Sequence, residues 1–491
     1  MRLADLVRGL AVSGDLGSNP EVSGVRHDSR TVAAGDLFVT WRGGRHDGSL
    51  FAHQAVERGA VAVVADRERP PEIDAATPWL VAAEPRALLA DLAQPVYGHA
   101  DRALILVGVT GTNGKSTVVE LAAAVLEAAG LPCGRLGTLG YRFPGLVATG
   151  ERTTPEASDL ARMLAELSGL GARAAAMEVS SHALAQGRVR GLTFDVGCFT
   201  NLTRDHLDFH ADLEDYLAVK ARLFEQMKPG GRAVLGVDDP SVRRLLERVP
   251  AAVTFGAGAA VAPARVELDA RGIRGELATP RGPLAFESPL LGRYNLLNLL
   301  AAVAIAEALE LPRDAVAQGL AATRPLPGRM EPVDLGQGFP VVVDYAHTDA
   351  ALEAAIRSLR ELAGRKVVVV FGCGGDRDTG KRPLMGRVAG ALADLPIVTS
   401  DNPRSEDPLA IVAAVEEGLK ASGNAAYRVV PDRREAIRRA VAVAAQNGWA
   451  LLVAGKGHES EQIIGSQRLP FSDRDELEKA LAERSTARER G

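Results

Sequence analysis

Unbroken apolar runs recur through the middle of the chain and predict buried strands. The run at 103–109 (ALILVGV) has no polar position, as a strand covered on both faces requires. Similar runs follow at 174–179, 194–200 and 233–237, and segments with helical spacing separate them. This order predicts a parallel sheet with helices on its faces.

The two ends of the chain carry related patterns. Short β-type runs at 36–41, 60–65 and 79–82 surround one helical stretch, which predicts a small mixed α/β unit. After a Pro/Gly cluster at 325–328, strands alternate with helical runs, and the strand patterns lie at 341–345, 366–371, 396–399, 427–430 and 450–454. That alternation is typical of a Rossmann-like doubly wound domain, although no G-x-G-x-x-G follows its first strand.

We therefore predict an α/β protein of three domains, consistent with 491 residues at about 150 residues per domain. The expected limits are 1–100 for a small mixed N-terminal domain, 101–327 for a central parallel-sheet domain and 328–491 for the doubly wound C-terminal domain.

Composition narrows the class of protein. Lysine and arginine number 57 and aspartate and glutamate 62, for a net charge of −5, so nucleic acid is not expected as a partner. No apolar stretch is long enough to cross a bilayer, and three scattered cysteines suit a reducing compartment. We expect a cytoplasmic monomer with no membrane insertion.

The strongest chemical signal is GTNGKST at 111–117, between a predicted buried strand and a predicted helix. Glycines let backbone N–H groups curl round phosphate oxygens, and the helix N-terminus adds positive potential. Lys115 can reach the β- and γ-phosphates, and the hydroxyl of Ser116 or Thr117 can ligate Mg²⁺. A chance glycine turn is the alternative, but the flanking strand and helix favour a P-loop that binds ATP.

Two further segments offer polar groups at strand ends. Glu178 ends a strand predicted to neighbour the P-loop strand, where it either holds a metal ion on the phosphates or faces water. The segment 201–210 (NLTRDHLDFH) provides oxygen and imidazole groups for a divalent ion or a base, or serves as a capping loop. Lys220, within a helical run, reads by itself as a solvated surface lysine.

The C-terminal domain has three polar clusters that each follow a strand, so they converge on one edge of its sheet. They contribute Arg377, Asp401, Asn402, Arg404, Gly455 and Glu459. Guanidinium groups hold carboxylates and acidic groups hold ammonium groups, so the set suits an amino acid, unless these residues are ordinary loop caps and surface pairs. The residues alone leave a kinase, an ATPase switch and an ATP-driven ligase open.

Several motifs together resemble the bacterial Mur ligases, which form amide bonds in peptidoglycan precursors at the expense of ATP. The motifs occur in the family's order: GTNGKST, MEVSSH, FTNLTRDHLDFH, YLAVKARLF, GRYNLLNLLAA, PGRME, DYAH and GKGHE. The similarity extends to VRHDSRTVAAGDLFVTWRGGRHDG near the N-terminus, so it covers nearly the whole chain.

The sequence DNPR at 401–404 resembles that of family members that add meso-2,6-diaminopimelate. That amino acid has a second carboxylate for Arg404 to clamp, whereas lysine has none. The resemblance thus implies an ATP-dependent ligase that joins diaminopimelate to the D-glutamate γ-carboxylate of UDP-N-acetylmuramoyl-L-alanyl-D-glutamate through an acyl phosphate. Alternatives are a lysine-adding Mur ligase, a folylpolyglutamate synthase-like ligase and a nucleotide-gated binding protein.

The resemblance also implies roles for individual residues, carried over by motif. ATP would contact Gly111, Thr112, Asn113, Gly114, Lys115, Ser116, Thr117, Asn295, Asn298, Arg329, Asp344 and His347. The UDP-muramoyl-dipeptide would contact His27, Ser29, Gly44, Arg45, His46, Thr153, Thr154, Ser180, Gln186 and Arg188. Diaminopimelate would contact Arg377, Asp401, Asn402, Pro403, Arg404, Gly455 and Glu459.

The family's catalytic and metal-binding positions fall on a smaller set. The catalytic residues would be Lys115, Glu178, His206 and Lys220. Magnesium would be held by Ser116, Glu178, His206 and Lys220, the last as a carbamate derived from CO₂ that turns a cation into an anionic ligand.

Overall fold

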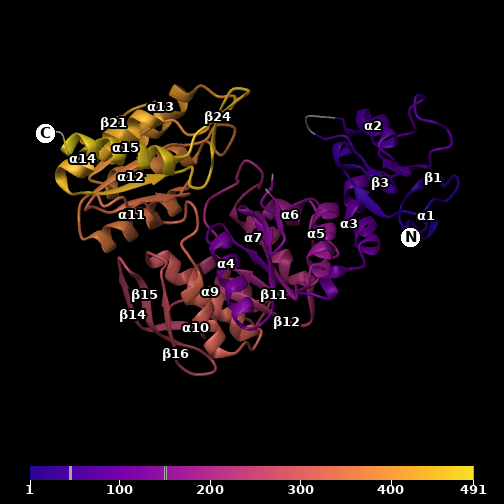
Figure 1. The fold of residues 1–491 in the computed structure, drawn as a ribbon, viewed down its shortest axis with the longest axis horizontal. Helices are drawn as coiled ribbons and strands as arrows, with labels where there is room; N and C mark the ends of the chain where they lie inside the picture. The colour runs from indigo at the N-terminus through magenta and orange to yellow at the C-terminus, as the bar shows by residue number, and fades with distance from the viewer. Residues whose placement is uncertain (44–46, 149, 151, 490–491) are drawn as a thin grey trace. The chain divides into compact units, whose positions relative to one another are not determined.

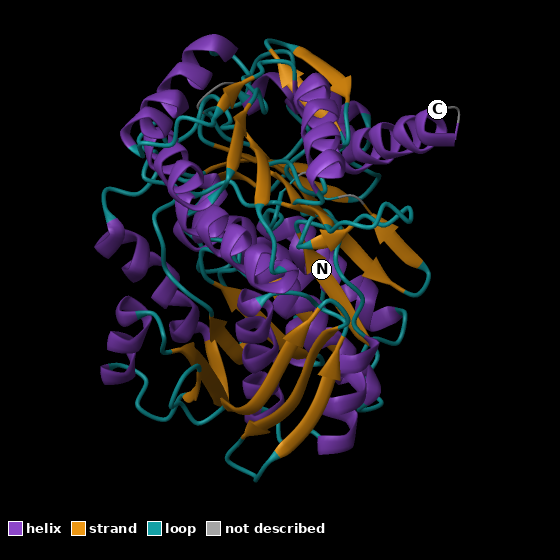
Figure 2. Cartoon of the chain, turned by 90° about the vertical axis from the view of Figure 1, so that its left-hand side faces the viewer, coloured by secondary structure: helices purple, strands orange, loops and turns teal. Residues whose placement is uncertain are grey.

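The computed structural model describes residues 1–43, 47–148, 150 and 152–489. The chain packs as two compact units. The first comprises Met1–Thr110, Gly130–Cys198 and Val219–Ala233, and the second comprises Gly111–Ala129, Phe199–Ala218 and Val234–Gly491. Helices and strands follow one another throughout the chain (Figure 1, Figure 2).

A five-stranded sheet with the order β1-β5-β4-β3-β2 forms the N-terminal part of the first unit. Its strands are β1 (Ser13–Asp15), β2 (Gly24–Arg26), β3 (Asp36–Val39), β4 (Ala62–Ala65) and β5 (Trp79–Val81). Strands β2 to β5 are parallel, and β1 is antiparallel to β5.

Side-chain alternation along β3 explains why this sheet is covered on both faces. Leu37 and Val39 pack with apolar residues of the helices α1 (Leu3–Leu6), α3 (Pro85–Val96) and α5 (Ala157–Gly169). Phe38, between them, packs on the other face with residues of α2 (Ala52–Glu57).

A second sheet of eight strands has the order β13-β12-β11-β6-β10-β7-β8-β9. Its strands are β6 (Ile105–Thr110), β7 (Cys133–Gly137), β8 (Gly140–Phe143), β9 (Leu146–Ala148), β10 (Ala174–Glu178), β11 (Phe194–Phe199), β12 (Met227–Gly236) and β13 (Val253–Phe255). Strand β10 is parallel to both β6 and β7, and β12 is parallel to β13. The antiparallel extension β7-β8-β9 was not predicted, because it lacks a long apolar run.

The helices that accompany these strands vary in length from four to sixteen residues. They are α4 (Lys115–Ala128), α6 (Ser181–Ala185), α7 (Leu213–Ala221), α8 (Pro240–Arg243), α9 (Arg293–Ala308) and α10 (Arg313–Ala322). In the second unit α4 packs against α9 and α10. A Cβ atom on Gly319 would lie 2.5 Å from the backbone of Val125, so glycine permits α10 to approach α4 closely.

The C-terminal sheet of the second unit has six strands in the order β17-β18-β22-β19-β20-β21. They are β17 (Glu331–Pro332), β18 (Val341–Asp344), β19 (Val367–Phe371), β20 (Leu395–Val398), β21 (Arg428–Val429) and β22 (Ala450–Ala454). All pairs except β17 with β18 are parallel. Apolar side chains fill both faces of this sheet, as its unbroken valine runs require.

Helices cover each face of the C-terminal sheet. One apolar cluster joins it to α11 (Asp349–Ala363), α12 (Lys381–Leu392) and α13 (Pro408–Ala421). The other joins it to α14 (Arg433–Asn447) and α15 (Asp473–Glu489), in the orange-to-yellow part of Figure 1. The prediction of an α/β fold with parallel sheets is confirmed, and the limits of the three domains stay a prediction.

Two small antiparallel sheets in the second unit were not predicted. One contains β14 (Ala262–Asp269), β15 (Gly272–Ala278) and β16 (Leu284–Ser288), and the other contains β23 (Glu461–Ile464) and β24 (Gln467–Pro470). Strand β24 is fully exposed and β14 has mainly exposed or half-buried positions, whereas in β15 and β16 buried positions are interspersed with exposed ones, so no unbroken apolar run marks any of them. Within the described ranges, no helix has the length and apolar character needed to span a membrane.

Candidate active site

The glycine-rich segment after β6 forms a tight loop that leads into α4. Gly111 has a φ of +138° and Gly114, the residue before α4, a φ of +87°, a region that L side chains rarely adopt. A Cβ atom on Gly111 would lie 1.9 Å from Thr200 Oγ1, and one on Gly114 would lie 2.3 Å from Asn298 Oδ1. Both positions therefore require glycine, for conformation and for space.

The loop is braced by the residues that follow β11. The Asn113 N–H donates to Asn201 Oδ1 at 2.9 Å, and Thr200 Oγ1 donates to the Asn113 carbonyl at 2.6 Å. The ammonium group of Lys115 donates to the carbonyls of Gly111 at 3.0 Å and Thr112 at 2.8 Å. These contacts fix the conformation of the loop and keep a cation beside it.

Residues distant in sequence meet this loop in the second unit. Arg329 Nη2 lies 3.4 Å from Ser116 Oγ, and the Arg329 guanidinium stands 4.7 Å over the ring of Tyr345. On α9, Asn298 Nδ2 donates to Asn295 Oδ1 at 2.9 Å, which holds the Asn298 carbonyl beside Gly114. The structure thus gathers several predicted ATP contacts around one loop.

The Asp344 carboxylate is held in place by several hydrogen bonds. Its carboxylate accepts from the Tyr294 hydroxyl and the Met330 N–H at 2.7 Å each, and from the Ala346 N–H at 2.8 Å. Burial raises the pKa of Asp344, against the opposing effect of Tyr294 and Arg329. The carboxylate therefore ties the segment after the predicted domain boundary to α9, and its contact with a nucleotide stays a prediction.

Asp205 links two histidines that the sequence selected. Its Oδ2 atom lies 3.5 Å from Nε2 of His206 and 3.5 Å from Nε2 of His347. His347 Nδ1 lies 2.9 Å from the Tyr345 carbonyl, which turns Nε2 toward Asp205. Burial acts to raise the pKa of Asp205, but His347, His206 and Lys381 outweigh it and hold that pKa well below its usual value.

In the first unit, Glu178 and Lys220 are buried. Glu178, at the end of β10, accepts from the Thr138 N–H at 2.8 Å and from Thr138 Oγ1 at 3.3 Å. Thr138 Oγ1 also lies 3.1 Å from Thr153 Oγ1. Lys220 on α7 is only 1 % exposed, so the interpretation of it as a solvated surface lysine is wrong.

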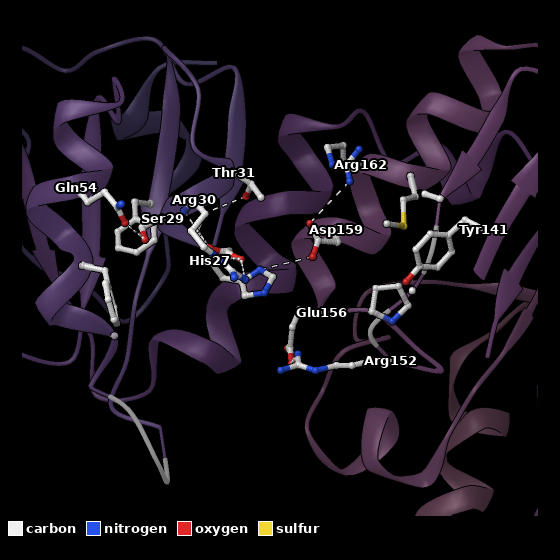
Figure 3. Close-up of a pocket in the computed structure, with 18 residues that line it drawn as sticks. His27, Ser29, Arg30, Thr31, Gln54, Tyr141, Arg152, Glu156, Asp159 and Arg162 are labelled. Atoms are coloured by element: carbon white, nitrogen blue, oxygen red, sulfur yellow. Dashed lines mark hydrogen bonds and ion pairs between the residues drawn. The ribbon is translucent and has the colours of Figure 1, made fainter. Parts of the chain in front are cut away.

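A cavity of about 1170 Å³ in the first unit contains part of the predicted nucleotide-sugar site. His27 and Ser29 line it from one side, and Tyr141, Arg152 and Glu156 line it from the other (Figure 3). Its volume suits a ligand of nucleotide-sugar size. Gly44, Arg45 and His46 lie outside the described residues.

The predicted contacts of the muramoyl dipeptide form a connected group in the same unit. Thr154 Oγ1 donates to the Glu178 carbonyl at 2.8 Å and accepts from the Ser180 N–H at 3.1 Å. Arg188 donates to the Thr154 carbonyl at 2.9 Å and to the Gln186 side chain at 2.5 Å. These side chains are therefore positioned next to one another by hydrogen bonds.

The three polar clusters of the C-terminal sheet do converge, as predicted. Asn402 Nδ2 donates to Glu459 Oε2 at 2.7 Å, and a Cβ atom on Gly455 would lie 2.6 Å from Asp401 Oδ2. Pro403 lies in the same loop, where its carbonyl is packed against Gly375. The loops after β19, β20 and β22 thus share one edge of the sheet.

Arg404 is held in one orientation by the loop after β19. It has a φ of +51°, and its Nη1 atom donates to the Gly375 carbonyl at 2.7 Å. Its backbone pairs with the β23–β24 hairpin through Ile463 and Gly465. Burial lowers the pKa of Arg404, and the positive charge of Arg377 lowers it further. The two guanidiniums are therefore near enough to act on each other through their charges, and their contact with a carboxylate ligand stays a prediction.

The predicted metal ligands are divided between the units, with Glu178 and Lys220 in the first and Ser116 and His206 in the second. Their assembly stays a prediction. Among the residues that the structure describes, no three histidine, cysteine, aspartate or glutamate side chains gather as a metal site.

Sequence reasoning missed several residues that hold these sites. Asp205 was one of the polar groups considered in the segment 201–210 but received no role of its own, and Lys456 stands inside GKGHE. Glu156 follows the TTP sequence at 153–155, and Arg433 pairs with Asp473 forty positions later. Asp205, Lys456 and Glu156 could have been found only because they lie in or next to motifs already selected. Nothing in the sequence around Arg433 points to its role.

A parallel sheet whose strand leads through a glycine loop into a helix defines a P-loop α/β protein. Three family models match the chain: the Mur ligase family catalytic domain at 21–97, the Mur ligase middle domain at 109–306 and the Mur ligase glutamate ligase domain at 328–457. The chain belongs to the Mur ligase family.

Curated relatives match over nearly the whole chain. A UDP-N-acetylmuramoyl-L-alanyl-D-glutamate--2,6-diaminopimelate ligase of Geobacter metallireducens is 45% identical, with 99% of each chain covered. The ligase of the same name from Geobacillus thermodenitrificans is 44% identical, with 95% of this chain and 96% of the relative covered.

Solved structures give the same fold. A structure described as UDP-N-acetylmuramoyl-L-alanyl-D-glutamate--2,6-diaminopimelate ligase has a TM-score of 0.67 and 34% identity, with 99% of each chain covered. A folylpolyglutamate synthase of Mycobacterium tuberculosis has a TM-score of 0.63 and 22% identity, with 75% of this chain and 92% of that chain covered. The latter shows a common fold alone.

Proposed function

We propose that the protein is an ATP-dependent ligase that joins meso-2,6-diaminopimelate to UDP-N-acetylmuramoyl-L-alanyl-D-glutamate in peptidoglycan precursor synthesis. The observation that carries the proposal is the 45% identity, over 99% of the chain, to a ligase with that substrate and amino acid in its name. Such a ligase needs one site that binds ATP and another that binds the amino acid, and the phosphate loop and the Asp401–Arg404 cluster are suited to these two tasks.

The reaction begins with activation of a carboxylate, which is a poor electrophile at neutral pH. An oxygen of the D-glutamyl γ-carboxylate attacks the γ-phosphorus of ATP, the bond to the β-phosphate oxygen breaks, and ADP leaves. The ammonium group of Lys115, which lies against the Gly111 and Thr112 carbonyls, offsets the charge on the transferring phosphoryl group. The backbone N–H groups at the start of α4 add to this effect.

The second step forms the amide. The neutral amine of diaminopimelate attacks the acyl carbon, the carbon–oxygen bond to phosphate breaks, and the amine loses a proton as inorganic phosphate leaves. Arg404 and Arg377 hold the amino acid by its carboxylates, and acidic side chains of the cluster hold an ammonium group. This orientation presents one amine for reaction.

The donor chemistry fits Mg²⁺. Ser116 and Glu178 offer a hydroxyl and a carboxylate, which are oxygen ligands of the kind that hard cations take, and His206 offers an imidazole. Bound magnesium would supply charge neutralisation on the nucleotide phosphates. Lys220 is buried, and a carbamate on its nitrogen would provide a further anionic oxygen donor.

A direct assay tests this proposal. The purified protein is incubated with ATP, Mg²⁺, the UDP-dipeptide and meso-diaminopimelate, and the UDP-tripeptide is measured by mass together with released phosphate. We expect product only when all three substrates are present. Glutamylation of folate without action on the UDP-dipeptide would favour the folylpolyglutamate synthase alternative.

The binding-protein alternative has its own test. We expect Lys115→Ala to abolish ligation and to fail to complement a strain that lacks the ligase. Slow ATP hydrolysis by the wild type without ligation, together with full complementation by Lys115→Ala, would instead indicate a nucleotide-gated binding protein. We also propose that the protein is a cytoplasmic monomer, which light scattering at several concentrations tests for the oligomeric state.

A further inference from the structure

A buried carboxylate in the first unit lies among three arginines. The Glu156 side chain is 3 % exposed and stands directly before α5. Arg86 Nη2, from α3, lies 2.7 Å from Glu156 Oε1, and Arg188 Nε lies 3.2 Å from the same oxygen. Arg152, four residues before Glu156, donates to that oxygen through Nη1. Three separate segments of the chain therefore meet at one carboxylate.

The cluster keeps a surplus of positive charge. The other acceptors that hold these guanidiniums are uncharged: the Gln186 amide oxygen accepts from Arg86 at 2.7 Å and from Arg188 at 2.5 Å. The Thr154 carbonyl accepts from Arg188 at 2.9 Å. One carboxylate balances one of three guanidinium charges, so two remain.

The surroundings of Arg188 favour a further anion beside it. Burial lowers the pKa of Arg188 to about 10, Glu156 opposes that effect, and Arg152 and Arg86 add to it by repulsion. The buried Nε atom of Arg188 lies 3.2 Å from Glu156 Oε1 but makes no hydrogen bond within the described residues. Both features indicate guanidiniums arranged for a ligand rather than for each other.

The cluster borders the cavity described above. Glu156 and Arg152 line that cavity, and Figure 3 shows their side chains meeting at its edge. His27 and Ser29 line the same cavity from the five-stranded sheet. An oxyanion held by the arginines would thus belong to a ligand that also reaches the N-terminal part of the unit.

We propose that Glu156 is a positioning residue that gathers Arg86, Arg152 and Arg188 into an oxyanion site for the nucleotide-dipeptide substrate. The assignment of the ligand rests on the proposed function. Without the central carboxylate, three guanidiniums repel one another and lose their common orientation. The oxyanion is either a peptide carboxylate or the diphosphate, and both carry the charge and acceptor geometry that arginine recognises.

Equilibrium binding without ATP or amino acid tests the proposal. Wild type and Glu156→Gln are titrated with UDP-N-acetylmuramoyl-L-alanyl-D-glutamate, UDP-N-acetylmuramoyl-L-alanine and UDP-N-acetylglucosamine. We expect Glu156→Gln to raise the Kd of the dipeptide ligand about tenfold. An increase for the dipeptide ligand alone assigns a glutamyl carboxylate, and an equal increase for all three ligands assigns the diphosphate. Unchanged Kd values for all three would overturn the proposal.

Further variants separate positioning from folding. Arg152 is half-exposed, so Arg152→Ala should fold normally and still raise the same Kd. Glu156→Asp keeps the charge and should recover most of the affinity. Arg190→Ala is the matched control, because Arg190 pairs with Asp91 at 3.0 Å and not with Glu156, and its Kd should stay within about twofold of wild type.

Turnover measurements distinguish this proposal from the proposed function. If wild type ligates diaminopimelate and Glu156→Gln binds the dipeptide equally well, the positioning role fails and the function stands. If wild type binds the dipeptide but forms no product, the function fails and the Kd ratio still tests the cluster. In active enzyme, KM for ATP and for diaminopimelate should stay within about twofold of wild type in Glu156→Gln, since neither contacts these arginines. A comparable rise in all three KM values would contradict a specific role.

Discussion

The ammonium nitrogen of Lys456 lies 3.0 Å from Glu459 Oε2, although Lys456 is fully buried. The same nitrogen donates to Asn402 Oδ1 at 3.2 Å and to the Glu461 carbonyl at 2.6 Å. Lys456 thus holds two residues of the predicted diaminopimelate site, one from the loop after β20 and one from the loop after β22. The buried ammonium group of Lys456 therefore fixes the orientation of the Asn402 and Glu459 side chains.

Replacing Lys456 should weaken amino-acid binding specifically. Lys456→Met removes three donors, frees Asn402 and Glu459 to turn, and should raise the KM for diaminopimelate about tenfold while leaving the KM for ATP nearly unchanged. The free energy of unfolding should fall by about 1–3 kcal/mol, measured by urea titration. Lys420→Met is the control, because Lys420 pairs with Glu416 at 3.2 Å on an exposed helix face. Equal effects of the two variants on the KM for diaminopimelate would refute the supporting role.

Arg433 and Asp473 form a buried bidentate pair, and Arg433 also contacts the carbonyls of Ser400, after β20, and Ala454, at the end of β22. Two N–H···O distances of 2.7 Å join them, and Arg433 also donates to the Ala454 carbonyl at 2.9 Å, directly before Gly455. Arg433→Met should destabilise the protein by about 3–5 kcal/mol, because it leaves a buried carboxylate unpaired. The neighbouring Arg434 is exposed, and its buried partner Glu476 also pairs with Lys479 at 2.9 Å, so Arg434→Met should cost about 1 kcal/mol or less. Similar unfolding midpoints for the two variants would contradict this difference.

Glycine at 114 is required for the phosphate loop. Gly114→Ala introduces a Cβ atom 2.3 Å from Asn298 Oδ1 at a φ of +87°, so the loop must shift, and ATP affinity should fall about 10- to 100-fold. Gly130, near the other end of α4, has a φ of +78° and no atom within 4 Å of such a Cβ. Gly130→Ala should lose a little stability and keep its ATP affinity. Calorimetric titration with ATP compares them, and equal affinities would show that Asn298 does not constrain the loop.

The Glu156 carboxylate should contribute stability that depends on pH. Burial acts to raise its pKa, but Arg188, Arg86 and Arg152 outweigh it, so the pKa in the folded protein lies below the ordinary value of 4.5. The contribution is therefore fully present above about pH 4.5 and is lost as the pH falls through the lower folded value. The difference in unfolding free energy between wild type and Glu156→Gln should be constant from pH 7 to 5 and shrink on further acidification. A difference that grows below pH 4.5 would contradict the sign.

Local sequence chemistry predicted the phosphate loop and the strands around it well. Unbroken apolar runs mark strands such as β6 and β19, and glycine with lysine marks the turn between β6 and α4. Strands such as β14 have mainly exposed or half-buried positions with charged residues among them, so no apolar period distinguishes them from loops. Their pairing depends on neighbouring strands, which the pattern of one segment does not contain.

Burial of charged side chains was the other part that the sequence could not provide. Lys220 and Lys456 look like solvated lysines in any local window, and only the packing of distant segments buries them. Arg433 meets Asp473 from forty positions away because α14 and the start of α15 lie side by side. Similarity to known motifs identified the residues that are expected to contact substrates. The residues that hold them in place, such as Lys456 and Arg433, could be identified only from the structure.

We propose that Arg404 and its loop select an amino acid with two carboxylates. The most direct test measures kcat/KM with meso-diaminopimelate and with L-lysine as the acceptor, for wild type and for Arg404→Ala. We expect wild type to prefer diaminopimelate by about 100-fold or more, and Arg404→Ala to lose about tenfold or more of its kcat/KM for diaminopimelate with ATP binding intact. Equal turnover of the two amino acids by wild type would contradict it.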